Sequence, residues 1–293
     1  MDILSLRLFL RVSERGALTA AAKDLSLSPA SASARIAKLE ETLGFQLFNR
    51  TTRAVSLTTD GSAFLSYAEH MLETLDAGLN AVSGNDKEAK GLLRMAMTGS
   101  FGRMHIIPLL GEFQLTYPNV SLDLSLSDEF INMVEGGYDL TIRNAPLVDS
   151  NFVAKKLAPD HRLLVASPIY LQEHGKPSTI SDLKKHQYVT LTGSNLIKFQ
   201  NGQSFSIPHA CSVNDGEAMR ALIEQGLGIG IKSLWNASES LKSGRLVQVL
   251  PEYPLITESS IWALYPKGRI VIPKVRVMVE FLLKQFSPVP PWV

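Results

Sequence analysis

The sequence predicts a multi-domain α/β protein with a small N-terminal helical unit, one long helix and a larger region of alternating strands and helices. Three observations predict it. Two short helical patterns with a tight break between them occupy residues 19–38. Apolar residues then recur at spacings of three and four between Phe64 and Val82, the period of an amphipathic helix. From Leu92 onward, strand and helix patterns alternate, as they do in α/β domains.

Length and composition narrow the class of protein. At 293 residues the chain is long enough for more than one domain, and 29 basic against 28 acidic residues give no overall polybasic character. Cys211 is the only cysteine, which excludes a disulfide framework and a cysteine metal cluster. The N-terminus lacks a signal-peptide pattern, and no apolar run reaches about 18 residues. We therefore expect a soluble, cytoplasmic protein with no membrane partner.

Three helices are expected before residue 44. The first spans residues 4–14, and in the second the small side chains of Ala21 and Ala22 let a neighbouring helix approach closely. Ser28 is placed to cap the third helix, with Pro29 at the first helical position, where a missing N–H has no cost. The buried face of this third helix is expected to carry Ala32, Ile36, Leu39 and Leu43.

The opposite face of the third helix carries short or basic side chains. They are Ser28, Ala30, Ser31, Ser33, Arg35 and Lys38. Short side chains let the backbone come close to another molecule, and the free amides at a helix N-terminus favour phosphate. This pattern suits a recognition helix that enters the major groove of double-stranded DNA. The alternative is a small-residue helix packed within a bundle.

A two-stranded hairpin is expected after the third helix. Apolar and polar residues alternate on both sides of residues 49–53, as in short strands. Arg50, Thr52 and Arg53 lie at the expected tip. Beside a recognition helix, such arginines would contact backbone phosphates or the minor groove. Taken in isolation, they are explained better as solvated surface arginines.

An ordered set of residues without gaps supports a resemblance to a known family. The set is Phe9, Gly16, Ala21, Ala22, Leu25, Ser28, Ser31, Arg35, Ile36, Leu39, Glu40, Leu43, Gly44, Leu47, Phe48, Arg50, Arg53, Leu57, Thr58 and Gly61. Through this set, residues 1–61 resemble the winged helix-turn-helix of the LysR-type transcriptional regulators. The resemblance implies DNA as a partner, a homodimer or homotetramer, and RNA polymerase as a further partner. Pro29-Ala30 departs from the Gln or Val that many members carry next to the cap serine, which bears on specific base contacts.

A long helix is expected to follow, with Thr59 or Asp60 as its cap. Its apolar residues form a coiled-coil seam about three heptads long. They are Phe64, Ala68, Met71, Leu75, Gly78 and Val82, flanked by Leu65, Leu72 and Leu79. Because this helix stands between two expected domains, we interpret it as a dimerisation helix, similar to the linker helix of the family. The alternative is an amphipathic helix docked on its own domain. The polar stretch 84–91 marks the following domain boundary.

The remaining chain is expected to form two lobes with a cleft between them. The first lobe is left near residues 157–161 and re-entered near Tyr265. Segments 139–143, 164–168, 226–230 and 273–276 match landmarks of the family's effector-binding domain, which has a periplasmic-binding-protein-like fold. Strands are expected at 92–98, 120–126, 138–143, 152–157, 161–166, 227–231 and 260–265, a hairpin at 199–213, and helices at 100–113, 128–135, 215–225 and 273–286.

These patterns give the domain boundaries. The winged helix-turn-helix is expected at 1–61, the linker helix at 62–88 and the effector-binding domain at 89–293. Within it, lobe I comprises about 89–161 and 265–293, and lobe II about 162–264. The expected function is promoter binding controlled by a small-molecule effector. The alternative is a two-lobed solute-binding module whose N-terminal helices serve only dimerisation.

Candidate effector residues in the first lobe follow the ends of strands. Ser100 and Phe101 open a helix after a strand, where amides and a hydroxyl favour an anion; in the family this position contacts small organic acids. Ser127 and Arg143 end two further strands, and hydroxyls with one arginine suit a carboxylate. The alternatives are helix caps for Ser100 and Ser127, a lobe-crossing ion pair for Arg143, and a core position for Phe101.

The second lobe contributes two further candidates. Thr192 and Ser194 follow a strand, in a loop that could close the cleft over an effector. Lys232 and Trp235 stand where the family more often has small or proline residues, which marks this side of the lobe as unusual.

No enzyme signature is complete. Ser181 and Lys184 fit a short Ser-x-x-Lys motif, but its companion motifs are missing and Ser181 is interpreted as a helix cap. The glycines at 226–230 follow a helix rather than a strand, which is the wrong order for a dinucleotide-binding fold. The histidines lack metal-ligand spacing. We expect no enzymatic activity, no cofactor and no metal site.

Overall fold

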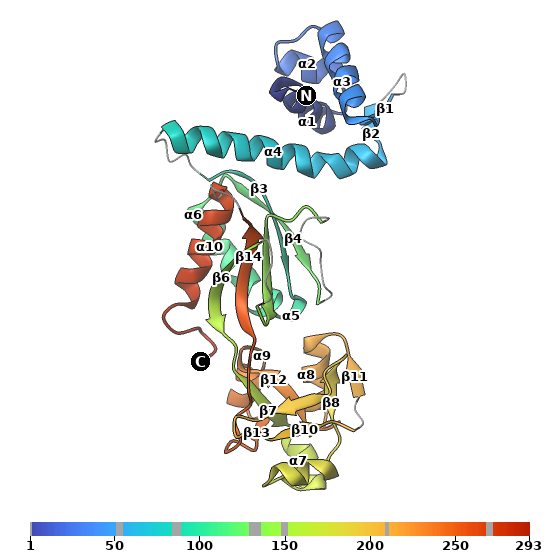
Figure 1. Ribbon diagram of the computed structural model, residues 1–293. Helices are drawn as coiled ribbons and strands as arrows, with labels where there is room; N and C mark the ends of the chain where they lie inside the picture. Colours follow the sequence, from blue (N-terminus) through green and yellow to red (C-terminus); the bar gives the residue numbers. More distant parts are fainter. Residues whose placement is uncertain are drawn as a thin grey trace. The chain divides into compact units, whose positions relative to one another are not determined.

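The computed structural model describes residues 2–50, 55–83, 89–128, 136–147, 152–208, 211–267 and 272–293. The chain divides into two compact units, one built from residues 1–88 with 269–273 and the other from 89–268 with 274–293. Each unit is described by itself (Figure 1). Among the described helices, none combines the length and the apolar character that crossing a membrane requires.

The first unit consists of helices around one small core and a short hairpin. Its elements are α1 (Ile3–Arg15), α2 (Leu18–Asp24), α3 (Pro29–Leu43), β1 (Phe48–Arg50), β2 (Val55–Leu57) and α4 (Thr59–Ser83). Asp2 caps α1 by accepting the amide of Ser5. Ala21 and Ala22 are buried in the core with Ile36 of α3, so the small side chains of α2 lie at its packing surface. The expected helix pair and hairpin are therefore present in this unit.

The first half of α4 packs on its own unit. Phe64 of α4 lies 5.6 Å from Phe9 of α1 between ring centroids, and Ala68 and Leu72 are buried in the same core. This part of the expected seam is thus covered by α1, as the docked-helix alternative holds. Further along α4, Leu79 is 61% exposed, so an apolar side chain remains available there.

The start of α4 differs in detail from the sequence expectation. Thr58, one residue before the expected caps, accepts the amide of Gly61 on its hydroxyl (2.8 Å). A Cβ at Gly61 would lie 2.1 Å from the carbonyl oxygen of Leu47. The hairpin and α4 therefore approach so closely that only glycine fits at position 61.

The second unit contains the expected two lobes. Lobe I has a five-stranded sheet in the order β4-β3-β5-β14-β6, in which β3 pairs parallel with β4 and β5, and β14 pairs antiparallel with β5 and β6. Its strands are β3 (Gly91–Met97), β4 (Val120–Leu126), β5 (Leu140–Ala145), β6 (Phe152–Pro159) and β14 (Ser260–Pro266). The expected helix at 128–135 lies almost entirely outside the described residues.

The helices of lobe I lie directly after β3 and near the C-terminal end of the sequence. After β3 come α5 (Gly99–Phe101), a π-helical turn (Gly102–Ile106), a 3₁₀ turn (Ile107–Leu109) and α6 (Leu110–Thr116). The last helix, α10 (Pro273–Phe286), packs on α6 through Phe281 and Phe113, whose ring centroids lie 5.4 Å apart.

Lobe II is built on a three-stranded sheet in the order β12-β7-β13 and two strand pairs. Its elements are β7 (Arg162–Ala166), α7 (Pro168–His174), β8 (Val189–Leu191), β9 (Leu196–Lys198), β10 (Ser204–Ser206), β11 (Cys211–Val213), α8 (Gly216–Glu224), β12 (Gly230–Ser233), α9 (Leu234–Lys242) and β13 (Val247–Val249). The expected hairpin at 199–213 is wrong in extent. The hairpin joins β9 to β10, and β11 pairs parallel with β8.

The expected cap at Ser181 is also wrong. A 3₁₀ helix spans Ile180–Lys185, and Thr179 caps it: its hydroxyl accepts the amide of Asp182, whose carboxylate accepts the amide of Thr179 in return. This reciprocal pair of hydrogen bonds satisfies two free donors at the helix start. The pKa of the Asp182 carboxyl is held low, chiefly by the hydroxyl and amide of Thr179.

Candidate functional site

Helix α3 presents short side chains to solvent. The hydroxyl of Ser28 accepts the amide of Ser31 (3.2 Å), so the expected cap is formed. Ala30 and Lys38 are exposed, and Ser33 is half-buried. Because Ala32, Ile36 and Leu39 fill the core on the other side, this face is free to approach a partner closely, as a recognition helix must.

Arg35 is held by a residue distant in the sequence. Its Nη1 lies 3.2 Å from Oδ1 of Asp2, the residue that caps α1. The pKa of the Asp2 carboxyl is lowered first by the backbone amide and hydroxyl of Ser5, and less by Arg35. Both side chains are partly exposed, so this surface ion pair is worth little in stability. It nevertheless sets where the Arg35 guanidinium rests.

The hairpin is anchored to α3 by one carboxylate. Oε1 of Glu40 accepts the amides of Leu47 (2.8 Å) and Phe48 (3.3 Å). This places β1 and β2 beside the C-terminal half of α3. Arg50 ends β1, whereas Thr52 and Arg53 lie outside the described residues.

A cavity of about 410 Å³ lies between the two lobes of the second unit. We call it the interlobe cavity. Lobe I contributes residues after β3 and β4 and at the end of β5, and lobe II contributes residues from the β8, α8, β12 and α9 region. Its lining includes Thr98, Ser100, Asp128, Asn144, Thr190, Thr192, Ser194, Gly216, Lys232, Trp235 and Asn236.

Buried polar atoms without a partner gather in the wall of this cavity. They are Thr98 Oγ1, Ser100 Oγ, Asn144 Oδ1, Trp235 Nε1 and Asn236 Oδ1, none of which has a hydrogen bond to any described residue. Buried polar groups in folded proteins are almost always hydrogen-bonded, because a lost bond costs about 1–3 kcal/mol. Their concentration at one cavity indicates a site built to bind a polar molecule.

Lys232 is the buried cation of the interlobe cavity. It is 5% exposed, and its Nζ donates to the carbonyl of Gly216 (2.6 Å). A Cβ at Gly216 would lie 2.8 Å from Ser100 Oγ and 3.9 Å from Lys232 Nζ, so both groups face this glycine. Burial lowers the pKa of Lys232 to about 8, with a further lowering from Arg220. An anion beside Nζ would favour the charged amine.

Asp128 bridges the lobes at the rim of the same cavity. Its Oδ1 accepts the amide of Gly99 at the start of α5 (2.7 Å), and its Oδ2 accepts the amide of Gly216 at the start of α8 (3.3 Å). Arg103 of lobe I also pairs with Glu217 (2.9 Å) and Asp215 (3.4 Å) of lobe II. These contacts hold the lobes together on the side of α8.

Family models match both parts of the chain. Residues 3–62 match the bacterial regulatory helix-turn-helix protein, lysR family, and residues 86–287 match the LysR substrate binding domain. The chain belongs to the LysR family of transcriptional regulators. It is therefore a DNA-binding regulator with an effector-binding domain, and not an enzyme.

Relatives of this LysR-type regulator extend over nearly its full length. The HTH-type transcriptional regulator DmlR of Escherichia coli K12 is 34% identical over 292 residues, covering 96% of this chain and 94% of that protein. The HTH-type transcriptional activator TtdR of the same strain is 32% identical over 284 residues, covering 94% and 91%.

Solved LysR-type structures share the fold. CrgA from Neisseria meningitidis has a TM-score of 0.63 at 28% identity, covering 98% of this chain and 99% of that chain. The Vibrio cholerae virulence activator AphB has a TM-score of 0.58 at 27% identity, covering 97% and 99%.

The expected effector residues divide into two groups. Ser100, Thr192 and Ser194 line the interlobe cavity of this LysR-type domain. Phe101 does not line it: the ring is fully buried and packs on Trp235 (5.2 Å between centroids), as the core alternative holds.

Ser127 and Arg143 lie together outside the cavity lining. The Arg143 Nη1 donates to the carbonyl of Ser127 (3.5 Å). Burial lowers the pKa of Arg143, and the nearby Asp128 opposes this change. Arg143 therefore lies close enough to Asp128 for their charges to interact, but it does not line the interlobe cavity.

Several cavity residues were not assigned an effector role from sequence. Lys232, Asp128 and Arg162 contribute charges, and Asn144 and Asn236 contribute amides. The departure of Lys232 and Trp235 from the common family pattern was the available signal for two of them.

Proposed function

We propose that this LysR-type regulator binds a small carboxylate-bearing effector in the interlobe cavity. The observation that carries the proposal is the buried amine of Lys232 among unpartnered polar atoms, which include Ser100 Oγ. A carboxylate beside Nζ would form a charge-assisted hydrogen bond and offset the burial of the amine. Thr192 and Ser194 would add hydroxyls from lobe II.

For DNA, we propose that the exposed face of α3 enters the major groove. Ser28, Ala30, Ser31, Ser33, Arg35 and Lys38 would face base edges and the adjoining backbone, and Arg50, Thr52 and Arg53 would contact phosphates from the hairpin. Such contacts suit two copies of the domain on a pseudo-palindromic site. We further propose a homodimer, or a homotetramer built from it, formed through the exposed part of α4 near Leu79.

Effector binding would then be coupled to transcription. A ligand that binds one arrangement of the lobes better shifts the population toward it, by no more than its difference in affinity for the two arrangements. In a dimer, such a shift would alter the spacing of the two α3 helices on DNA, and with it contact with RNA polymerase.

The effector proposal is tested by titration calorimetry of the full chain with a panel of small mono- and dicarboxylates. We expect at least one member to bind, and Lys232→Met to weaken it by tenfold or more. Exposed Lys38→Met serves as the matched control and should leave this binding unchanged. A panel member that binds equally well to Lys232→Met would contradict the assigned role of the lysine.

The DNA proposal is tested with the DNA upstream of the regulator's own gene. Fluorescence anisotropy should show affinity that falls steeply with salt, and Arg50→Ala should reduce that slope. Ser33→Ala should instead change the sequences recovered in a site-selection assay. Affinity that does not depend on salt would contradict a binding mode based on phosphate contacts.

A further inference from the structure

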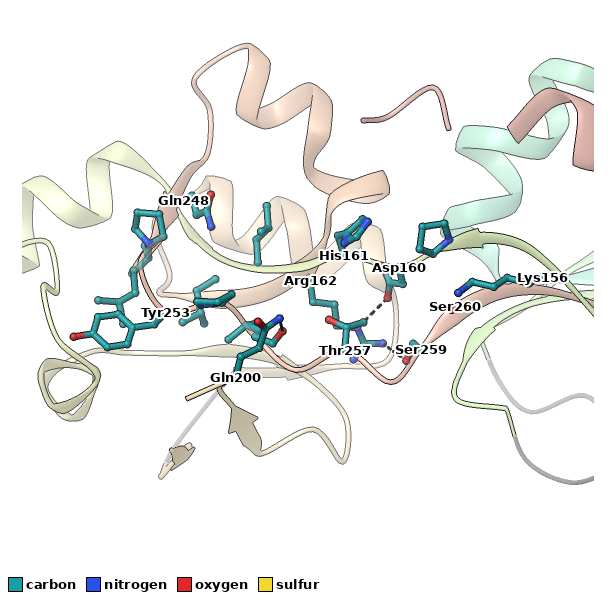
Figure 2. Close-up of a pocket in the computed structure, with 18 residues that line it drawn as sticks. Lys156, Asp160, His161, Arg162, Gln200, Gln248, Tyr253, Thr257, Ser259 and Ser260 are labelled. Carbon is teal, nitrogen blue, oxygen red and sulfur yellow. Dashed lines mark hydrogen bonds and ion pairs between the residues drawn. The ribbon is translucent and has the colours of Figure 1, made fainter. Parts of the chain in front are cut away.

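A second cavity of about 380 Å³ lies in the second unit where the chain passes between the lobes. We call it the hinge pocket (Figure 2). Two segments of the chain connect the lobes here, and we call them the passages. One passage lines the pocket with Lys156, Asp160 and Arg162, and the other lines it with Ser259 and Ser260. Lobe II contributes further residues, which include Gln200, Gln248 and Tyr253. The hinge pocket is separate from the interlobe cavity, although Arg162 lines both.

A buried carboxylate stands in the wall of the hinge pocket. The side chain of Asp160 is fully buried, and its Oδ2 accepts from Arg162 Nε (3.1 Å) and Ser233 Oγ (3.1 Å). Its Oδ1 has no hydrogen-bond partner among the described residues. Because a buried carboxylate oxygen left unpaired is costly, a donor that enters the pocket would be stabilised there, most of all a charged one.

Positive charge flanks this carboxylate. Lys156 and Gln248 lie on either side of the Asp160–Arg162 pair (Figure 2). Both line the hinge pocket, and neither lines the interlobe cavity. Arg162 also donates from Nη2 to Ser259 Oγ (3.1 Å), which ties the two passages together. A ligand here would therefore meet one unsatisfied anionic oxygen and two cationic side chains, a combination that suits a zwitterion.

Part of the pocket lining is apolar and comes from lobe II: it consists of Val249, Leu250, Pro251 and Leu255, which we call the apolar wall. Val249, Leu250 and Leu255 belong to the buried core of this lobe, against which Tyr253 packs. Binding sites for small molecules commonly combine such apolar walls with a few polar groups that fix orientation. Here the charged groups Lys156, Asp160 and Arg162 lie on one passage, and the apolar wall lies in lobe II together with the amides of Gln200 and Gln248.

We propose that the hinge pocket binds a free amino acid with an apolar side chain. Its ammonium group donates to Asp160 Oδ1, its carboxylate lies beside Lys156 and Arg162, and its side chain contacts the apolar wall next to Tyr253. A ligand in this position contacts one passage directly and reaches the other through Arg162, whose Nη2 donates to Ser259 Oγ, so it stabilises the present angle between the lobes. The proposal does not depend on which molecule occupies the interlobe cavity.

The experiment uses the full chain and the apolar L-amino acids, each added singly, in thermal unfolding followed by titration calorimetry. We expect at least one to raise the unfolding temperature and to bind with measurable affinity. Lys156→Ala and Gln248→Ala should each weaken that binding by about tenfold, whereas Lys232→Met, which alters only the interlobe cavity, should leave it unchanged. The N-acetyl derivative and the corresponding amine, which each lack one charge, should not bind.

Three results would overturn the proposal. The first is the absence of binding by every apolar amino acid, each tested at a millimolar concentration and in 10-fold excess over the protein. The second is binding that Lys232→Met abolishes and Lys156→Ala leaves intact, which places the ligand between the lobes instead. The third is binding of the N-acetyl derivative as tight as that of the free amino acid. Because Lys156 is exposed, its alanine variant is expected to fold normally.

Discussion

The amide nitrogen of Gly216 in lobe II lies 3.3 Å from Oδ2 of Asp128 in lobe I. The other oxygen of this carboxylate accepts the amide of Gly99 (2.7 Å). One side chain of the protein thus supplies an anion to two helix starts, at the rim of the cavity that holds Lys232. The positive electrostatic potential at these two helix starts is therefore already partly neutralised by the carboxylate of Asp128.

Neutralising this carboxylate is expected to strengthen effector binding. Asp128→Asn keeps one acceptor oxygen for a bridging amide but removes a negative charge near Lys232, so affinity for a carboxylate should rise by about fivefold, equivalent to about 1 kcal/mol. Titration calorimetry measures it. Asp123→Asn, which changes a surface partner of Arg94, is the control. A loss of affinity in Asp128→Asn would show that the bridge between the lobes outweighs the repulsion.

The lowered pKa of Lys232 predicts how carboxylate binding depends on pH. With a pKa of about 8 in place of 10.5, the amine is charged below pH 7 and loses its proton as the pH rises through 8. Carboxylate affinity should therefore be constant between pH 6 and 7 and fall by up to tenfold per unit above 8. The groups that oppose this lowering are Asp215, Asp128 and Glu217. Calorimetry from pH 6 to 9.5 tests it, and a profile unchanged to pH 9.5 contradicts it.

The lowered pKa of Lys232 also affects how the stability of the folded protein depends on pH. Because the folded-state pKa of Lys232 lies below its unfolded value, the unfolded chain binds more protons between pH 8 and 10.5. The contribution of Lys232 to the free energy of unfolding should then increase with pH in that window and stay constant below it. The difference in unfolding free energy between the wild type and Lys232→Met, measured in urea at pH 7 and 9.5, reports it. Equal differences at the two values would contradict the shift.

The contact between Gly61 and Leu47 gives a matched pair of glycine substitutions in one helix. Gly61→Ala places a Cβ 2.1 Å from a backbone oxygen, which cannot move without shifting the hairpin, and should destabilise the first unit by about 2 kcal/mol or more. Gly78→Ala in the same helix meets no atom within 4 Å and should be neutral or stabilising by up to about 1 kcal/mol. Urea unfolding of both variants measures the difference. Similar stability of the two would mean that the close approach is relieved at little cost.

Local signals explain what the sequence predicted well. Ser28 and Pro29 mark the start of α3 by chemistry that acts within four residues, and the structure has the cap in place. The helix expected at 215–225 is also present as α8, and Asp215 caps it by accepting the amides of Glu217 and Ala218. Such features depend on neighbouring residues, so a helix start can be located from the sequence, although the choice between adjacent hydroxyls failed where Thr179 and not Ser181 forms the cap.

Features that depend on contacts between residues distant in the sequence could not be predicted from local sequence patterns. The parallel pairing of β11 with β8 joins Cys211 to Val189, and nothing within either three-residue strand specifies its partner. The position of Lys232 in the interlobe cavity depends on the pairing of β12 with β7 and on α8, because the Gly216 carbonyl accepts a hydrogen bond from the amine. A lysine in a short apolar strand does not by itself reveal whether it reaches solvent or a cavity.

The ion pair of Arg35 with Asp2 belongs to the same class, because it joins residues 33 positions apart. It also leads to a prediction about DNA. In the free protein Arg35 rests on Asp2, so DNA would have to compete with this carboxylate for the guanidinium. Asp2→Asn removes the competing charge, and asparagine still caps a helix well. We expect Asp2→Asn to tighten DNA binding by about threefold, with a stronger salt dependence.

Arg35→Ala supplies the opposing arm of that experiment. It should weaken DNA binding, and combining it with Asp2→Asn should remove most of the gain from Asp2→Asn, because the released guanidinium is then absent. Anisotropy with wild type, both single variants and the double variant completes the cycle. If Asp2→Asn weakens binding as Arg35→Ala does, the pair serves to fix α1 against α3 and not to hold Arg35 for DNA. Thermal unfolding separates these outcomes from a general loss of structure, since a surface pair of this kind contributes only about 0–1 kcal/mol.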